Sequence, residues 1–148
     1  MNKYKLSAAF VILSAFATLT LGAQESVTDP ASFLGMNMPE MLQRFGPPAS
    51  VYSVRGPEEW QDDVVFIYND YEFYILKDRV WQVGVKTAYR IRLADPDSAV
   101  FLSLGEAVLS GREFAVFPLK GTNWPAALRC NFDSSGKVTA IFIYRSDL

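Results

Sequence analysis

Histidine is absent from the 148 residues and cysteine occurs once, so the sequence lacks side chains on which much enzyme chemistry depends. Without histidine, Ser-His-Asp sites, Cys-His sites and the usual zinc sites cannot be assembled. The single cysteine, Cys130, allows no intramolecular disulfide bond. Glycine-rich phosphate-binding loops and calcium-binding loops are also missing. We therefore expect no bound metal, no cofactor and no catalytic activity.

The sequence also has no run of basic residues, and its overall charge is slightly acidic. It contains 14 lysines and arginines against 16 aspartates and glutamates, and two of the lysines, Lys3 and Lys5, precede an apolar run at the N-terminus. Without those two, 12 basic residues remain against 16 acidic ones, a net charge of −4 for residues 24–148. Binding to nucleic acid and electrostatic attachment to an anionic membrane are therefore not expected.

Residues 1–23 have the layout of a secretory signal peptide. Lys3 and Lys5 form a short positive region, an uncharged apolar stretch follows, and Ala23 is a small residue at the expected cleavage site. A membrane anchor is the alternative, because the apolar stretch is only slightly shorter than the ~20 residues that span a bilayer. No cysteine lies near residue 23, so a lipid anchor is not expected. We predict an exported chain, periplasmic or extracellular, with no stable membrane span after cleavage and a flexible leader over 24–32.

A short helix is predicted in the segment GMNMPEMLQRFGPP, residues 35–48. Asn37 can cap the first turn, and Glu40 three residues later completes a capping box. Gly46 is typical of the residue that ends a helix, and the two prolines after it prevent continuation. Four apolar residues recur at helical spacing: Met38, Met41, Leu42 and Phe45. A helix this short is not stable alone, so we expect the apolar stripe to pack on a sheet.

The rest of the chain alternates short apolar strands with turns. The predicted strands are 50–54, 64–68, 71–76, 79–86 (with 88–93 extending it or adding another), 113–119, 126–132 and 137–145. Asn69-Asp70 and Lys77-Asp78 have the length of tight hairpin turns. A second, weaker helix is predicted over 98–111. In ALRCNFD, alternation places Cys130 on an apolar strand face as a small core residue, and a reactive or dimer-forming thiol is the alternative.

The order of these elements repeats along the chain. Ser103-Leu104-Gly105-Glu106 matches Asn37-Met38-Pro39-Glu40 as polar cap, apolar residue, breaker and acid, and strands follow each match. We therefore predict an α+β fold of two tandem units, each a short helix plus an antiparallel β-meander, at 33–93 and 94–148. The helices of both units are expected to pack on one face of the sheet.

The first helix carries a resemblance to a known family. Gly35-Met36-Asn37, Glu40, Met41-Leu42 and Gly46-Pro47-Pro48 resemble the pattern G-M-[ST]-x-x-[EQ]-V … L-G-x-P of small cell-envelope proteins of the BamE (SmpA/OmlA) family. The tandem arrangement is similar to that of the beta-lactamase inhibitor protein. The resemblance implies helices on one face of an antiparallel sheet, with the other face or an edge binding a protein. The second unit departs from the pattern, because Phe101-Leu102 replace Gly-Met, and the lipid-bearing cysteine is absent.

Pairing outward from the two hairpin turns assigns the central strands to two faces. Around Lys77-Asp78, Tyr74 is predicted to face Trp81, and Glu72 to face Val83. The first face is nearly all apolar and is assigned to the core: Val64, Phe66, Tyr68, Tyr71, Phe73, Ile75 and Val80. The second face mixes aromatic and charged residues: Val65, Ile67, Glu72, Tyr74, Leu76, Arg79, Trp81 and Val83. Burial of this second face against the other unit is the alternative.

Aromatic residues bordered by opposite charges are typical of protein interfaces. The residues predicted to bind a partner are Glu72, Tyr74, Arg79, Trp81 and Val83. The leading hypothesis is an exported, non-catalytic protein-binding module of the cell envelope that acts as an inhibitor, adaptor or assembly factor. A carrier of small apolar ligands, with the aromatic face lining a cavity, is the alternative. Two-carboxylate chemistry is a third hypothesis, but acid pairs such as Asp62-Asp63 lie in predicted loops.

Overall fold

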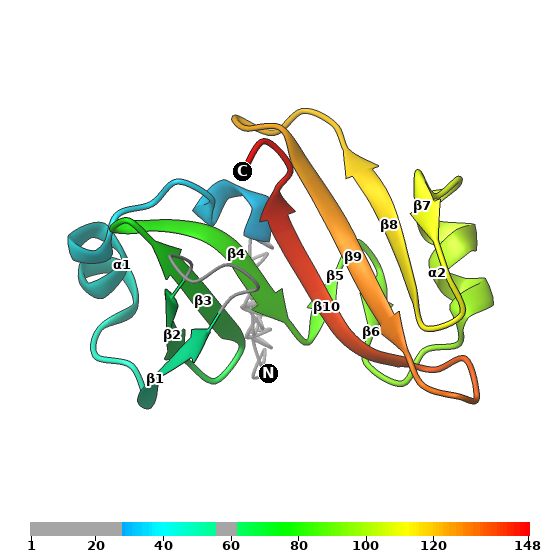
Figure 1. Cartoon of the computed structure of the whole chain (residues 1–148), viewed down its shortest axis with the longest axis horizontal. Helices are drawn as coiled ribbons and strands as arrows, with labels where there is room; N and C mark the ends of the chain where they lie inside the picture. Colours follow the sequence, from blue (N-terminus) through cyan, green and yellow to red (C-terminus); the bar gives the residue numbers. More distant parts are fainter. Residues whose placement is uncertain (1–27, 56–61) are drawn as a thin grey trace, which may run out of the picture.

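The computed structural model describes residues 28–55 and 62–148, and its centre is an antiparallel sheet of eight strands (Figure 1). The strand order is β1-β2-β3-β4-β10-β9-β8-β7. These strands are β1 Ser50–Arg55, β2 Asp62–Ile67, β3 Tyr71–Leu76, β4 Arg79–Val85, β7 Leu109–Ser110, β8 Phe114–Leu119, β9 Ala126–Phe132 and β10 Val138–Arg145. The other elements are the 3-10 helix η1 Pro30–Phe33, the helices α1 Met38–Phe45 and α2 Asp97–Leu104, and a hairpin of β5 Thr87–Ala88 and β6 Ile91–Arg92. The predicted signal peptide, 1–23, lies outside the described residues.

The prediction of two tandem helix-plus-meander units is wrong, because the strands form one continuous sheet. β4 and β10 lie side by side at its centre, with Val85 opposite Ile141 and Val83 opposite Ile143 (Figure 1). Most of the buried apolar residues accordingly form a single cluster that extends from α1 to β9. Hairpins could be predicted because their turns are local in sequence, whereas the β4–β10 pairing joins distant segments that no turn connects.

One face of the sheet carries the three helices of the described residues. Phe33 of η1 and Phe45 of α1 pack on Phe73 of β3, with ring centroids 5.7 and 4.9 Å apart. At the other end of the sheet, Phe101 of α2 packs edge-on to Phe117 of β8 at 5.4 Å. Residues of the β5–β6 hairpin join the same buried cluster. None of the described helices packs against the opposite face.

Helix α1 forms for the predicted reasons. The Asn37 side chain accepts from the Glu40 backbone N–H at 2.9 Å, while the Glu40 carboxylate accepts from the Asn37 N–H at 3.0 Å, so the capping box is confirmed. Gly46 ends the helix with φ 73°. Met41 is fully buried, but Leu42 is 38% exposed, so its assignment to the buried stripe is wrong. Within this eight-residue helix, Met41 is buried, and Met38 and Phe45 pack partly buried against the core.

Helix α2 and the segment before α1 differ from the prediction. Gly105, with φ 83°, ends α2 as its C-terminal cap, so the helix does not reach residue 111 and Gly105 does not lie in a first turn. Of the predicted leader, residues 24–27 lie outside the described residues. From Pro30 onward it forms η1, which the Asp29 side chain caps by accepting from the Ala31 N–H at 3.0 Å. Ala31 is buried there, so this part of the segment joins the core.

The lone thiol lies where the alternation placed it. Cys130 is fully buried on the covered face of β9, which confirms that part of the prediction. Burial raises the pKa of the thiol to about 12, so it stays protonated and unreactive at neutral pH. No helix within 28–55 or 62–148 is long and apolar enough to cross a membrane.

Candidate binding surface on the open face

The face of the sheet opposite the helices carries two rows of side chains and is named the open face. The first row, called the upper row below, runs through β1, β2, β3, β4 and β10: Tyr52, Val65, Tyr74, Gln82 and Tyr144. The second row runs through β2, β3, β4 and β10: Ile67, Glu72, Gly84 and Phe142. Asp63 and Trp81 lie beside the upper row. Aromatic side chains from strands that are distant in sequence therefore meet on one surface.

Tyr74 is the centre of this surface. Its hydroxyl donates to Glu72 Oε2 at 3.2 Å, and its ring meets Phe142 edge-on at 6.0 Å between centroids. Burial raises the pKa of Tyr74, and the nearby Glu72 carboxylate and Tyr52 hydroxyl raise it further. The phenol therefore stays neutral and remains a hydrogen-bond donor. Tyr52 at the edge is 43% exposed, so the aromatic surface is partly open to solvent.

A small hollow lies beside Glu72 and Phe142 of the second row, between β3, β4 and β10. Gly84 is buried here, and a Cβ added to it would lie 3.2 Å from Glu72 Oε2 and 3.4 Å from the Phe142 ring. The absence of a side chain at Gly84 therefore lets Glu72 and Phe142 approach each other. The hollow has a volume of about 160 Å³ and also borders Tyr71 and Lys86.

Trp81 and Asp63 form the second polar contact of the open face. The indole Nε1 donates to Asp63 Oδ1 at 3.2 Å. Asp63 is 5% exposed, and burial raises the pKa of its carboxyl group, with the Trp81 hydrogen bond opposing that shift. The Glu72 and Asp63 carboxylates of the open face thus each accept a hydrogen bond from an aromatic side chain.

The structure brings together three of the five residues predicted to bind a partner. Glu72, Tyr74 and Trp81 lie on the open face, although Tyr74 pairs with Gln82 and not with Trp81. The register shifts by one residue between Ile75 and Tyr74, and the β-bulge leaves Trp81 as the extra residue.

The other two predicted residues lie elsewhere. Because of the bulge, Val83 faces Phe73, is fully buried and belongs to the core, so its assignment to the binding face is wrong. Arg79 lies at the start of β4, where its Nη1 donates to the Gly35 carbonyl at 3.0 Å. It borders a different hollow, beside Trp124.

Four residues of the open face were not among those predicted from the sequence: Tyr52, Gln82, Phe142 and Tyr144. The alternation in VTAIFIYR was a usable signal for Phe142 and Tyr144, because Ile141 and Ile143, which alternate with them, are apolar and buried. What the sequence did not reveal was the pairing of β10 with β4. That pairing places these two rings beside β3.

No group of three or more histidine, cysteine, aspartate or glutamate side chains in the described parts of the chain could hold a metal ion. The open face presents aromatic side chains and two carboxylates that accept hydrogen bonds from aromatic side chains.

Comparisons with known proteins give a fold likeness and no family. No protein-family model and no curated protein matches the chain. A solved structure of an extracellular protein containing a SCP domain, from Bacillus anthracis, superposes with a TM-score of 0.59 at 11% identity, covering 99% of this chain and 51% of that one. A cysteine-rich secretory protein from Staphylococcus aureus superposes with a TM-score of 0.51 at 13% identity, covering 82% and 46%. The chain spans about half the length of each.

These likenesses correct the family resemblance. The structural neighbours are described as SCP-domain and cysteine-rich secretory proteins, not as BamE-like proteins or the beta-lactamase inhibitor protein. The residues that carried the resemblance, Gly35 to Pro48, encode a capped short helix. Because such a helix is a local solution available to many folds, it did not identify the family.

Proposed function

We propose that the chain is a non-catalytic protein-binding module of an exported protein, and that the open face contacts the partner. The observation that carries the proposal is the gathering of Tyr52, Tyr74, Trp81 and Phe142 on the sheet face that no described helix covers. Aromatic anchors bordered by polar groups dominate the energetics of protein interfaces. The descriptions of the two structural neighbours as extracellular and secretory support export.

Pre-organisation supports the same proposal. The Tyr74 hydroxyl is tied to Glu72, and the Trp81 indole is tied to Asp63, so both rings are oriented before any partner arrives. Rings that are already fixed lose little conformational entropy on binding. A partner would complete the desolvation of Tyr52, which is 43% exposed in the chain alone.

The carrier of small apolar ligands is the weaker candidate. Small-molecule sites usually enclose roughly 300–1,000 Å³. The hollow beside Glu72 and Phe142 has about 160 Å³, which is too small to enclose such a ligand. A flat aromatic surface suits a protein partner better.

A binding experiment with matched variants tests the proposal. The full chain is immobilised, proteins exported by the source cell are passed over it, and a retained protein is then titrated against parent and variants by calorimetry. Tyr52→Ser should weaken binding by about thirtyfold, because truncating an aromatic anchor typically costs ~2 kcal/mol or more. Leu102→Ser is the control, since Leu102 is 89% exposed on α2, which packs on the covered face.

The thermal midpoint of each variant is measured alongside, since a lost fold would also lose binding. The proposal is wrong if Tyr52→Ser binds as tightly as the parent, or if Leu102→Ser weakens binding as much.

A further inference from the structure

A second hollow lies on the side of the molecule away from the open face, where four separate segments meet. Its volume is about 460 Å³, within the range of roughly 300–1,000 Å³ typical of small-molecule sites. Glu40 and Arg44 come from α1, Arg79 from the start of β4, Gly35 from the η1–α1 connection, and Trp124 from the β8–β9 loop.

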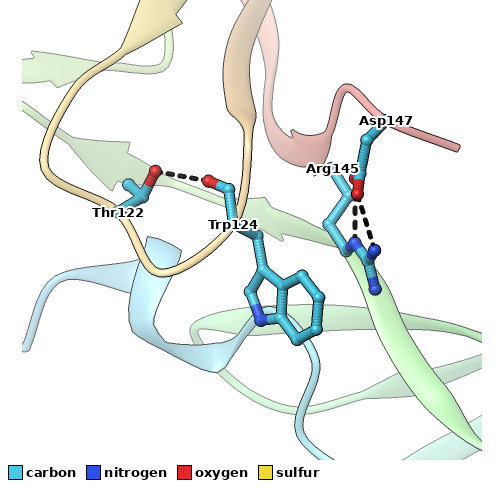
Figure 2. Close-up of polar contacts among 4 residues, drawn as sticks. All are labelled: Thr122, Trp124, Arg145 and Asp147. Carbon is cyan, nitrogen blue, oxygen red and sulfur yellow. Dashed lines mark hydrogen bonds and ion pairs between the residues drawn. The ribbon is translucent and has the colours of Figure 1, made fainter.

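Trp124 is held in place but not buried (Figure 2). The Arg145 guanidinium lies 3.9 Å from the indole centroid and is itself fixed by two hydrogen bonds to Asp147, at 3.0 and 2.8 Å. The Thr122 hydroxyl donates to the Trp124 carbonyl at 2.6 Å and fixes the loop. Even so, Trp124 is 39% exposed. The indole is therefore oriented by the stacked Arg145 guanidinium, and its exposed part borders the hollow.

The position of Trp124 requires a glycine at residue 35. A Cβ at Gly35 would lie 2.5 Å from Trp124 Nε1, and its φ of +84° is one that other residues rarely adopt. Gly35, the first residue of the GMNMPE segment, therefore allows the Trp124 indole to pack against the backbone. The sequence pattern alone did not reveal this role.

The hollow carries two guanidinium groups that form no ion pair with any described residue. Arg79 uses Nη1 for the Gly35 carbonyl, which leaves its other N–H donors available. The Arg44 guanidinium lies over the Phe33 ring at 4.7 Å. The ion pairs among the described residues involve Arg55 and Arg145 instead. Glu40, whose carboxylate caps α1, brings the formal charge of the hollow to +1.

We propose that this hollow binds a carboxylate attached to an apolar or aromatic group. The carboxylate pairs with Arg79 and Arg44, and the apolar group packs on Trp124. Guanidinium groups match the planar, two-oxygen geometry of a carboxylate. The single net positive charge suits a monoanion, whereas the Glu40 carboxylate opposes a more highly charged phosphate. The carboxylate belongs either to a chain end or to an acidic side chain of a peptide.

N-acetylphenylalanine is the probe, because it places one carboxylate beside one aromatic ring. Its amide is the matched neutral control. Each is titrated into the full ¹⁵N-labelled chain, and the indole N–H signal of Trp124, assigned with Trp124→Phe, is followed by NMR. The acid should give a saturable shift of that signal, and the amide should bind at least tenfold more weakly. The peptide acetyl-Phe-Glu-amide, titrated in parallel, distinguishes a side-chain carboxylate from a terminal one.

Variants separate this site from general charge effects. Arg79→Gln and Arg44→Gln should each weaken binding of the acid severalfold. Arg92→Gln is the control, since Arg92 is exposed on β6 and does not line the hollow. Equal binding of acid and amide, no movement of the Trp124 signal with either carboxylate probe, or unchanged affinity in Arg79→Gln would each overturn the proposal. Because none of these variants changes an open-face residue, the outcome is independent of the proposed protein-binding function.

Discussion

Asp63 is the residue of the open face whose protonation most affects the fold. Its folded-state pKa lies above the ordinary value, because burial disfavours the charged form. Between the unfolded and folded pKa values the folded chain binds more protons, so stability falls as pH rises through that window. Asp63→Asn removes the charge and keeps an oxygen that can accept from Trp81. The variant should therefore gain stability relative to the parent on going from pH 4 to pH 7.

Urea unfolding of parent and Asp63→Asn at both pH values measures this difference directly. The comparison isolates one group, because all other titrating residues are shared. If the unfolding free energy of the variant instead falls relative to that of the parent as the pH rises, the charged carboxylate is stabilised by Trp81. The burial argument is then wrong.

Met41 and Leu42 are neighbours in α1 with very different surroundings. Met41 is fully buried and Leu42 is 38% exposed. Met41→Ala should cost about 2–5 kcal/mol of unfolding free energy through lost contacts and a cavity. Leu42→Ala should cost about 1 kcal/mol or less, in line with surface positions. Chemical denaturation of the two variants checks the order, and equal losses would mean that α1 is rotated from the orientation described.

The ends of α1 are the best example of structure that the sequence alone predicts. Asn37→Ala removes the side-chain acceptor of the capping box and should cost about 1 kcal/mol. Gln43→Ala is a matched control in the same helix, because Gln43 is exposed and alanine favours helices. Thermal unfolding measures both. A loss in Gln43→Ala as large as in Asn37→Ala would mean that the cap contributes nothing specific.

Strand register could be predicted only up to the first irregularity. The β2–β3 pairing is confirmed, with Phe66 opposite Phe73 and Val65 opposite Tyr74. Between β3 and β4 the bulge at Trp81 shifts the pairing by one residue. No residue in VWQVGV, residues 80–85, indicates such a bulge. The bulge follows from tertiary contacts, since Trp81 turns toward Asp63 while Val80 and Val83 both enter the core. That single shift decided which predicted site residues lie on the open face.

For the molecule as a whole, the continuous sheet predicts cooperative unfolding. The core is shared across the β4–β10 junction, where Val83 and Ile143 are opposite and fully buried. The backbone amides of β3 and of β9 should therefore lose their protection against hydrogen exchange at the same urea concentration. Ile143→Ala should lower both midpoints together, with a loss of about 2–5 kcal/mol. Two separate transitions would indicate that the halves on either side of the junction fold independently.

The arrangement of the whole molecule was the hardest feature to predict from the sequence. The β2–β3 and β3–β4 hairpins could be predicted from their own turns, and the covered face of these strands from its apolar alternation. The pairing of β4 with β10 joins two strands that are distant in sequence and come together only in the folded chain. The open face depends on that junction, because it is what places Phe142 beside Tyr74.

Site-specific photo-crosslinking tests the central claim, that the open face binds a protein, most directly. A photoreactive phenylalanine derivative replaces Tyr52 on the open face or, as a control, Leu102 on α2, and each chain is irradiated among proteins exported by the source cell. The account predicts a discrete adduct from position 52 that excess parent chain suppresses and excess Tyr74→Ser variant does not, and no such adduct from position 102. An adduct from position 102 alone, or equal suppression by parent and Tyr74→Ser, would contradict it.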